Sequence, residues 1–167
     1  MRLSDRIRQG DELLQDFELA AEERLLDAQE LLARGHGTGA AYLLGYVAEM
    51  LLKTAVFLFD GARPGDKVGP RLSPAKKWAQ KFLPGRPFTN YHDVLFWAHV
   101  LRKKRSDKGR PLASTVSQNL IRIAGRINRM WAVDLRYFGF EVTVDFAKAL
   151  FEDVMWIKKN HSSLWRS

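Results

Sequence analysis

The sequence predicts an all-α protein, and three observations support that prediction. No segment alternates apolar and polar residues in the manner of a half-buried strand. Several long segments instead repeat apolar residues every three or four positions, as amphipathic helices do. Residues 40–59 are almost continuously apolar, which is typical of a helix buried on nearly every side. We therefore expect a four-helix up-and-down bundle with a basic, partly helical insert between its second and third main helices.

The first main helix is expected over residues 11–33. One face of this helix is apolar and the opposite face is acidic. Gly35 and Gly37, on either side of His36, are expected to end the helix in a turn. Its apolar stripe consists of Leu13, Phe17, Ala20, Ala21, Leu25, Ala28, Leu31 and Leu32. The length of 167 residues suits one domain over 1–167, with its core in 11–60 and 115–160.

The second main helix is expected to follow Thr38 as its N-cap and to end near Phe59. Glu49 and Lys53 lie in its middle, one helical turn apart. Burying an acid and a base is costly unless they pair, so we expect an ion pair there. The same two charges argue against a membrane span, although the apolar run is long enough for one.

Four polar side chains share one face of this second helix. They are Tyr42, Tyr46, Glu49 and Lys53, spaced at multiples of a helical turn. Two interpretations stay open. The face forms the polar wall of a cleft in which Glu49 orients a substrate or a catalytic partner, or it is a buried ion pair beside tyrosines that are satisfied by the backbone.

Residues 61–114 are expected to be the insert. Five of the six prolines lie within 61–90, with a short helix expected near 73–82 and another over 91–104. Residues 61–110 carry 13 basic and 3 acidic residues, whereas residues 1–60 carry 6 and 11, within a net charge of +8. This asymmetry favours an anionic partner or an acidic surface of another subunit, and a solvated basic loop is the alternative.

The last two main helices are expected over residues 115–131 and 144–160, the latter capped by Thr143. The helix over residues 115–131 has one apolar face. Its opposite face carries Asn119, Arg122, Arg126 and Arg129. Arginine binds phosphate through two parallel hydrogen bonds, so this row predicts contact with RNA, and a solvated helix face is the alternative. Further cations that could extend the row are Arg102, Lys103, Lys104, Arg105, Lys108 and Arg110.

Several chemistries have no sequence support. The chain has no cysteine, so disulfides, thiolate metal sites and a cysteine nucleophile are excluded. Phosphate-binding, nucleophile-elbow and dinucleotide-binding glycine motifs are missing, and the four histidines lack metal-ligand spacing. We expect no metal and no cofactor. The first residues do not form a secretion signal, so a cytoplasmic location without membrane contact is expected.

Two motifs resemble HEPN (higher eukaryotes and prokaryotes nucleotide-binding) domains. The run of residues 41–53, AYLLGYVAEMLLK, resembles the GYxxExxLK pattern of their second helix, and Leu135-Arg136-Tyr137 is similar to the RY that precedes their last helix. The resemblance covers residues 11–60 and 115–160. It implies a four-helix bundle that dimerises. Many members are metal-independent RNases of toxin–antitoxin, CRISPR-linked or phage-defence systems, and others are non-catalytic and pair with a nucleotidyltransferase.

The RNase members carry an Arg-x4–6-His motif, supported by a polar residue on the second helix. The resemblance implies Arg136 for the arginine and Glu49 for the polar residue, with Tyr137 beside them on the wall of a groove. The histidine position falls at Glu141, Val142 or Thr143, so the usual histidine is missing. The segment from Arg86 to His92 matches the spacing but lies in the insert.

Three functions follow as hypotheses. The first is a module, non-catalytic or atypical, that binds RNA or a nucleotide-bearing partner. The second is a metal-independent endoribonuclease toxin, which requires His36, His92 or His99 to fold into the groove. The third is an interaction subunit without RNA affinity, in which acidic and basic surfaces of two chains meet.

Overall fold

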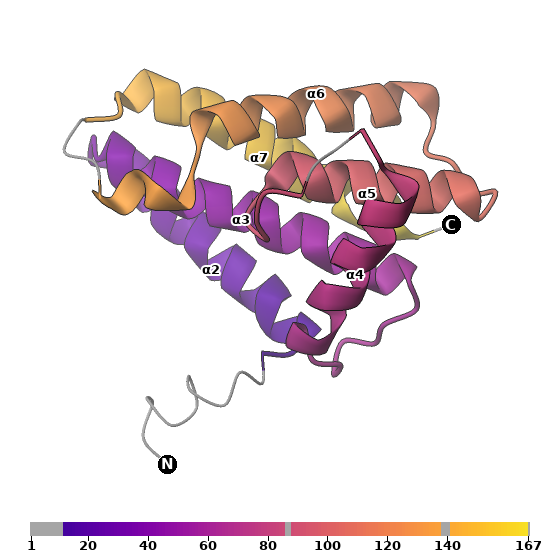
Figure 1. The fold of residues 1–167 in the computed structure, drawn as a ribbon. Coiled ribbons are helices and arrows are strands. Elements are labelled where there is room, and N and C mark those ends of the chain that lie inside the picture. The colour runs from indigo at the N-terminus through magenta and orange to yellow at the C-terminus, as the bar shows by residue number, and fades with distance from the viewer. Residues whose placement is uncertain (1–11, 86–87, 138–140, 167) are drawn as a thin grey trace, which may run out of the picture.

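The structure is a computed structural model that describes residues 12–85, 88–137 and 141–166 (Figure 1). Within these ranges the regular elements are all helical, which confirms the predicted all-α class. They are α2 (Leu14–Ala33), α3 (Gly37–Phe59), α4 (Gly69–Phe82), α5 (Val94–Asp107), α6 (Ser114–Met130), the 3-10 helix η1 (Val133–Tyr137) and α7 (Val144–Trp165).

Helix α3 is the central element of the bundle, and α2, α5 and α7 pack around it. Its apolar residues are buried along almost its whole length, as the continuous apolar run predicts. The helix is long and apolar enough to cross a membrane, but 78% of its most apolar window is buried inside the bundle. Its hydrophobicity is thus accounted for by the protein core.

Helix α5 belongs to this core, although it lies in the segment that we expected to be an insert. Val94, Trp97 and Leu101 are fully buried, and the Trp97 ring meets Phe57 of α3 edge-on at 5.6 Å between centroids. Helix α6 packs on α5 and α7. The segment 61–114 therefore supplies a structural helix, because the apolar side chains between residues 94 and 101 fill the space beside α3.

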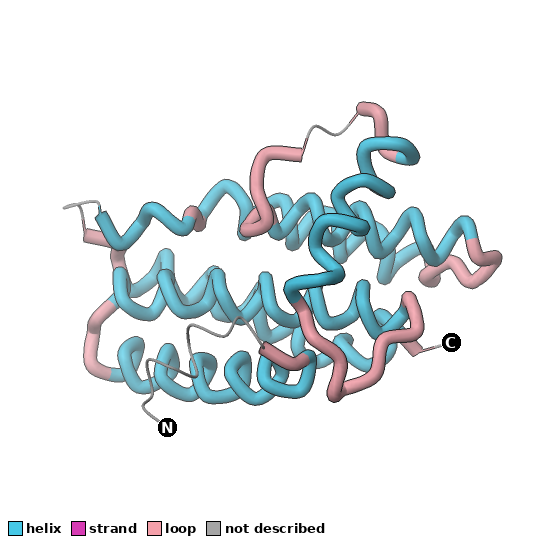
Figure 2. Tube along the Cα trace, turned by 60° about the horizontal axis from the view of Figure 1, so that its bottom comes forward, coloured by secondary structure: helices cyan, strands magenta, loops and turns pink. Residues whose placement is uncertain are grey.

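Helix α4 runs at a steep angle to the bundle helices (Figure 2). Its start is tied to the chain preceding α2, where the Val68 N–H donates to Glu12 O at 2.9 Å. Farther along α4, Trp78 lies under the ammonium of Lys104, with Nζ 4.2 Å from the ring centroid. The basic segment 61–114 thus attaches its own short helix to the bundle partly through cation–π contacts.

Several predicted helix starts differ from the structure: α2 begins at Leu14 and α4 at Gly69, rather than near residues 11 and 73. Helix α5 begins at Val94, because the Asp93 carboxylate accepts the Phe96 N–H at 2.8 Å and so acts as N-cap. His92 therefore precedes the helix and does not share a face with His99. Helix α3 begins at Gly37 rather than after Thr38, whose hydroxyl instead accepts the Val142 N–H at 2.8 Å.

Two other boundary predictions are confirmed. The Thr143 hydroxyl caps α7 as expected, accepting the Phe146 N–H at 3.3 Å. Gly35 ends α2 with a φ of 81°, a left-handed conformation that glycine adopts without steric cost. This turn sets α2 directly against α3.

Candidate functional site

Glu49 and Lys53 form a buried ion pair in the middle of α3. The Lys53 ammonium donates to Glu49 Oε1, and both side chains are only 5% exposed. Lys53 also lies 5.6 Å from the Trp97 ring centroid. The predicted pairing is confirmed, and it leaves the second carboxylate oxygen of Glu49 for another partner.

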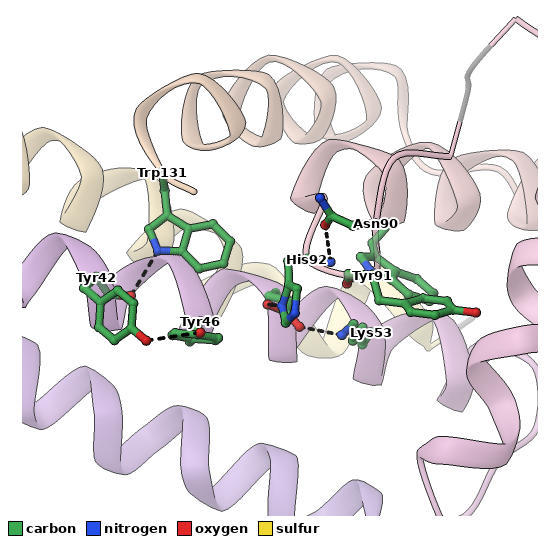
Figure 3. Close-up of polar contacts among 9 residues, drawn as sticks. Tyr42, Tyr46, Lys53, Asn90, Tyr91, His92 and Trp131 are labelled. Atoms are coloured by element: carbon green, nitrogen blue, oxygen red, sulfur yellow. Dashed lines mark hydrogen bonds and ion pairs between the residues drawn. The ribbon is translucent and has the colours of Figure 1, made fainter. Parts of the chain in front are cut away.

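That partner is His92, which reaches Glu49 from the loop before α5. The imidazole Nδ1 lies 2.9 Å from Glu49 Oε2, and the histidine side chain is 41% exposed (Figure 3). Two contacts hold the loop. The His92 N–H donates to the side-chain oxygen of Asn90 at 2.7 Å, and the Trp97 indole N–H donates to Tyr91 O at 2.9 Å. A half-exposed histidine is thus fixed against a buried acid.

An aromatic wall continues the site toward the N-terminal end of α3. The Tyr42 and Tyr46 hydroxyls lie 3.3 Å apart, and the Tyr46 ring meets both His92 and Trp131 edge-on. The Trp131 indole N–H donates to Tyr42 O at 3.1 Å. Trp131 fits because residue 45 is glycine, since a Cβ there would lie 2.0 Å from the indole ring.

A pocket of about 200 Å³ opens beside His92. It lies where the loop preceding α5 meets the end of α6 and the start of η1. Its lining is mostly polar and comprises Thr89, Asn90, His92, Asp93, Asn128, Trp131, Ala132, Val133 and Asp134. In Figure 3, Trp131 and Asn90 stand on either side of His92.

The arrangement is suited to acid–base chemistry. When Nδ1 of a histidine donates to a carboxylate, the other ring nitrogen, Nε2, is left as the proton acceptor, and the carboxylate stabilises the imidazolium that forms. The Lys53 ammonium pairs with Glu49 on its buried side and so compensates for the burial of the carboxylate. Among the residues that the structure describes, no three metal-ligating side chains lie close enough together to hold a metal ion.

The other predicted groove residues lie as follows. Tyr42 and Tyr46 are half-buried on the wall, whereas Lys53 lies behind Glu49 and is not part of an open surface. Tyr137 is 71% exposed on η1. The backbone of Arg136 belongs to η1, three residues after the pocket-lining Val133, and its side chain is outside the described part of the chain, as is Arg86.

The cations predicted to bind RNA differ in exposure and in whether they are already paired with an acid. Arg102, Arg122 and Arg129 are exposed. Lys103 pairs with Asp107, Lys104 pairs with Asp60 at 2.8 Å, and Arg126 holds both oxygens of the buried Asp153. One member of the predicted arginine row, Arg126, is therefore engaged in an ion pair between α6 and α7.

Arg105 requires a correction. It is buried, and its guanidinium donates to the backbone oxygens of Leu164 and Arg166 at 3.1 and 3.0 Å. Burial lowers the pKa of this guanidinium. It holds the end of α7 against α5 and cannot contact an external phosphate, because it falls on the inward face of α5.

Sequence reasoning predicted the buried ion pair of Glu49 with Lys53 but gave His92 only a minor role. The segment from Tyr91 to Asp93 was assigned to a helix, which hid its loop geometry. The signal that could have found it is Asp93, a favoured N-cap residue directly before an apolar run. Asn128, Trp131 and Asp134 were missed, because nothing in their spacing shows that the end of α6 returns to this loop.

Comparisons with known proteins do not assign this chain to a family. No family model, no curated protein and no solved structure matches the chain. The HEPN resemblance therefore rests on the motifs within residues 41–53 and 135–137, and it stays a prediction.

Proposed function

We propose that this chain cleaves RNA without a metal ion, with His92 as the proton-transferring residue. The observation that carries the proposal is the contact between His92 Nδ1 and the buried Glu49 carboxylate, 2.9 Å apart, at the edge of a polar pocket. His92 would then take the role of the histidine that is missing from the segment after Arg136.

The reaction follows from the chemistry of the pair. His92 Nε2 takes the proton of a ribose 2′-hydroxyl, and the 2′ oxygen attacks the neighbouring phosphorus. The bond from phosphorus to the 5′ oxygen breaks, which leaves a 2′,3′-cyclic phosphate and a strand with a 5′-hydroxyl after proton return. Glu49 orients the imidazole and balances its developing positive charge.

The cations of the chain would hold the RNA. The net charge is +8, and Arg102, Arg122 and Arg129 are exposed. Arg136 is the arginine that the HEPN resemblance would place at the phosphate, where it would stabilise negative charge in the transition state. A homodimer and a toxin–antitoxin or phage-defence setting remain predictions from that resemblance.

Binding of RNA without cleavage is the second candidate. The same exposed arginines favour it, because arginine binds phosphate whether or not chemistry follows. It predicts a complex that weakens steeply with salt. A pure interaction subunit would show neither cleavage nor salt-dependent RNA binding.

The test uses labelled RNA, the purified full chain and EDTA, at low and moderate salt. We expect cleavage that falls by about 10²–10⁴-fold in His92→Gln, the range for loss of a general base. The matched control is His36→Gln, because His36 is an exposed histidine at the start of α3, outside the site. Cleavage that persists in His92→Gln, or a salt-sensitive shift with no cleavage in the wild type, would overturn the proposal.

A further inference from the structure

We propose that the pocket beside His92 binds a guanine base of the RNA and so selects the bond to be cleaved. This inference rests on the proposed function for its place in a reaction. It concerns the hydrogen-bonding groups of the pocket, which the proton transfer itself does not use.

The pocket has the size of a subsite. Its volume of about 200 Å³ is below the roughly 300–1,000 Å³ of pockets that enclose a whole drug-sized ligand. A single planar ring system suits it better than an entire nucleotide. Trp131, Ala132 and Val133 form its apolar side, and polar groups from two separate segments form the rest.

Part of the polar lining is committed to the fold. Asp93 accepts the Phe96 N–H with one oxygen and the Thr89 hydroxyl with the other, at 2.8 and 3.0 Å. The side-chain oxygen of Asn90 accepts the His92 N–H. These bonds fix the loop, and they leave the amide NH₂ of Asn90 as a donor beside the pocket (Figure 3).

The other side of the pocket carries uncommitted groups. Within the described part of the chain, the side chains of Asn128 and Asp134 make no hydrogen bond or ion pair, and Asp134 is exposed. The pocket thus offers a carboxylate acceptor from the start of η1 and amide donors from Asn90 and Asn128. Its carboxylates disfavour a phosphate group inside, so the phosphate belongs outside, toward the arginines.

This combination matches guanine among the four RNA bases. The guanine edge presents two adjacent N–H donors, N1–H and N2–H, which one carboxylate accepts in parallel, and the O6 acceptor, which an amide can satisfy. Adenine, cytosine and uracil each place a ring acceptor or a carbonyl oxygen where guanine has a donor, and the carboxylate repels it. Asp134 is therefore the residue that would set specificity.

The first experiment measures binding of guanosine 3′-monophosphate to the full chain by calorimetry, beside the adenosine, cytidine and uridine analogues. We expect tighter binding of the guanosine nucleotide by roughly 10- to 100-fold, the discrimination of a bidentate base contact. Asp134→Asn removes this preference. Asp145→Asn is the matched control, since Asp145 is an exposed acid at the start of α7, and it keeps the preference. Equal binding of all four, or a preference that survives in Asp134→Asn, would overturn the inference.

The second experiment separates this inference from the proposed function. An RNA that contains each base in several contexts is incubated with wild type and Asp134→Asn, and the cut sites are mapped. Cleavage without guanine preference overturns the pocket assignment and leaves the cleavage proposal standing. Guanosine-selective binding with no cleavage supports the pocket and overturns the reaction.

Discussion

A histidine, an ion pair and a pocket lie beside each of two opposite faces of α3. The two histidines differ in the group that they contact. On one face His92 meets the carboxylate of Glu49. On the other, His161 of α7 donates Nε2–H to the backbone oxygen of Leu51 at 3.0 Å. Burial lowers the pKa of His161, so that imidazole stays neutral at neutral pH.

The pockets and ion pairs differ in the same way. The pocket beside His161, lined by residues of α2, α3 and α7, has a volume of about 680 Å³ and is the larger. Its ion pair, Lys158 with Glu22, is half-exposed, whereas Glu49 and Lys53 are buried. Under the proposed function, the face that reacts is the one with the smaller pocket. There a buried carboxylate contacts a half-exposed histidine.

The largest expected effect in this comparison concerns the two ion pairs. Lys53→Met leaves Glu49 buried without its cation, and should lower the free energy of unfolding by about 3–5 kcal/mol. Lys158→Met removes an exposed pair and should cost about 0–1 kcal/mol. Urea unfolding of the two variants measures the difference.

A double variant sharpens this result. Glu49→Leu with Lys53→Met removes both charges, so it should recover most of the stability lost in Lys53→Met. If the double variant is as unstable as the single one, the loss comes from packing of the lysine stem and not from an unpaired carboxylate.

An intermediate effect is expected at the aromatic wall of the His92 face. Gly45→Ala places a methyl group against the Trp131 ring, and should destabilise the fold by about 1–3 kcal/mol, the usual cost of overpacking. NMR of the indole N–H should show that the bond from Trp131 to Tyr42 O is perturbed. Gly65→Ala, where no atom lies within 4 Å of the new methyl group, is the control and should be nearly neutral.

The smallest expected effect is the pH dependence that His161 confers. Its folded pKa is lowered from 6.5, so its contribution to stability is full above that pH and is lost as the pH falls below it. The slope from one such proton is at most about 1.4 kcal/mol per pH unit. Unfolding of wild type and His161→Gln between pH 5 and 7.5 should show a shallower slope in the variant, and identical slopes would contradict the assignment.

Much of the fold could be predicted from the sequence, because its helices have strong periodicity and clear ends. The central role of α3 and its buried ion pair followed from two charges in an apolar run. The core position of α5 could not be predicted in this way, since the local sequence shows that the helix is apolar but not which other helix it contacts. The same limit applies to the site: Glu49 was found by its unusual burial, while His92 depends on a contact across 43 residues.

The origin of the two site residues suggests how this chain could be altered. Glu49 belongs to the interior of the most buried helix, whereas His92 lies on the loop that precedes α5. Loops accept sequence change far more readily than packed cores do. The chain can thus serve as a scaffold in which the acid is permanent and the facing side chain is exchangeable, so new chemistries could be selected by varying residues 89–92 alone.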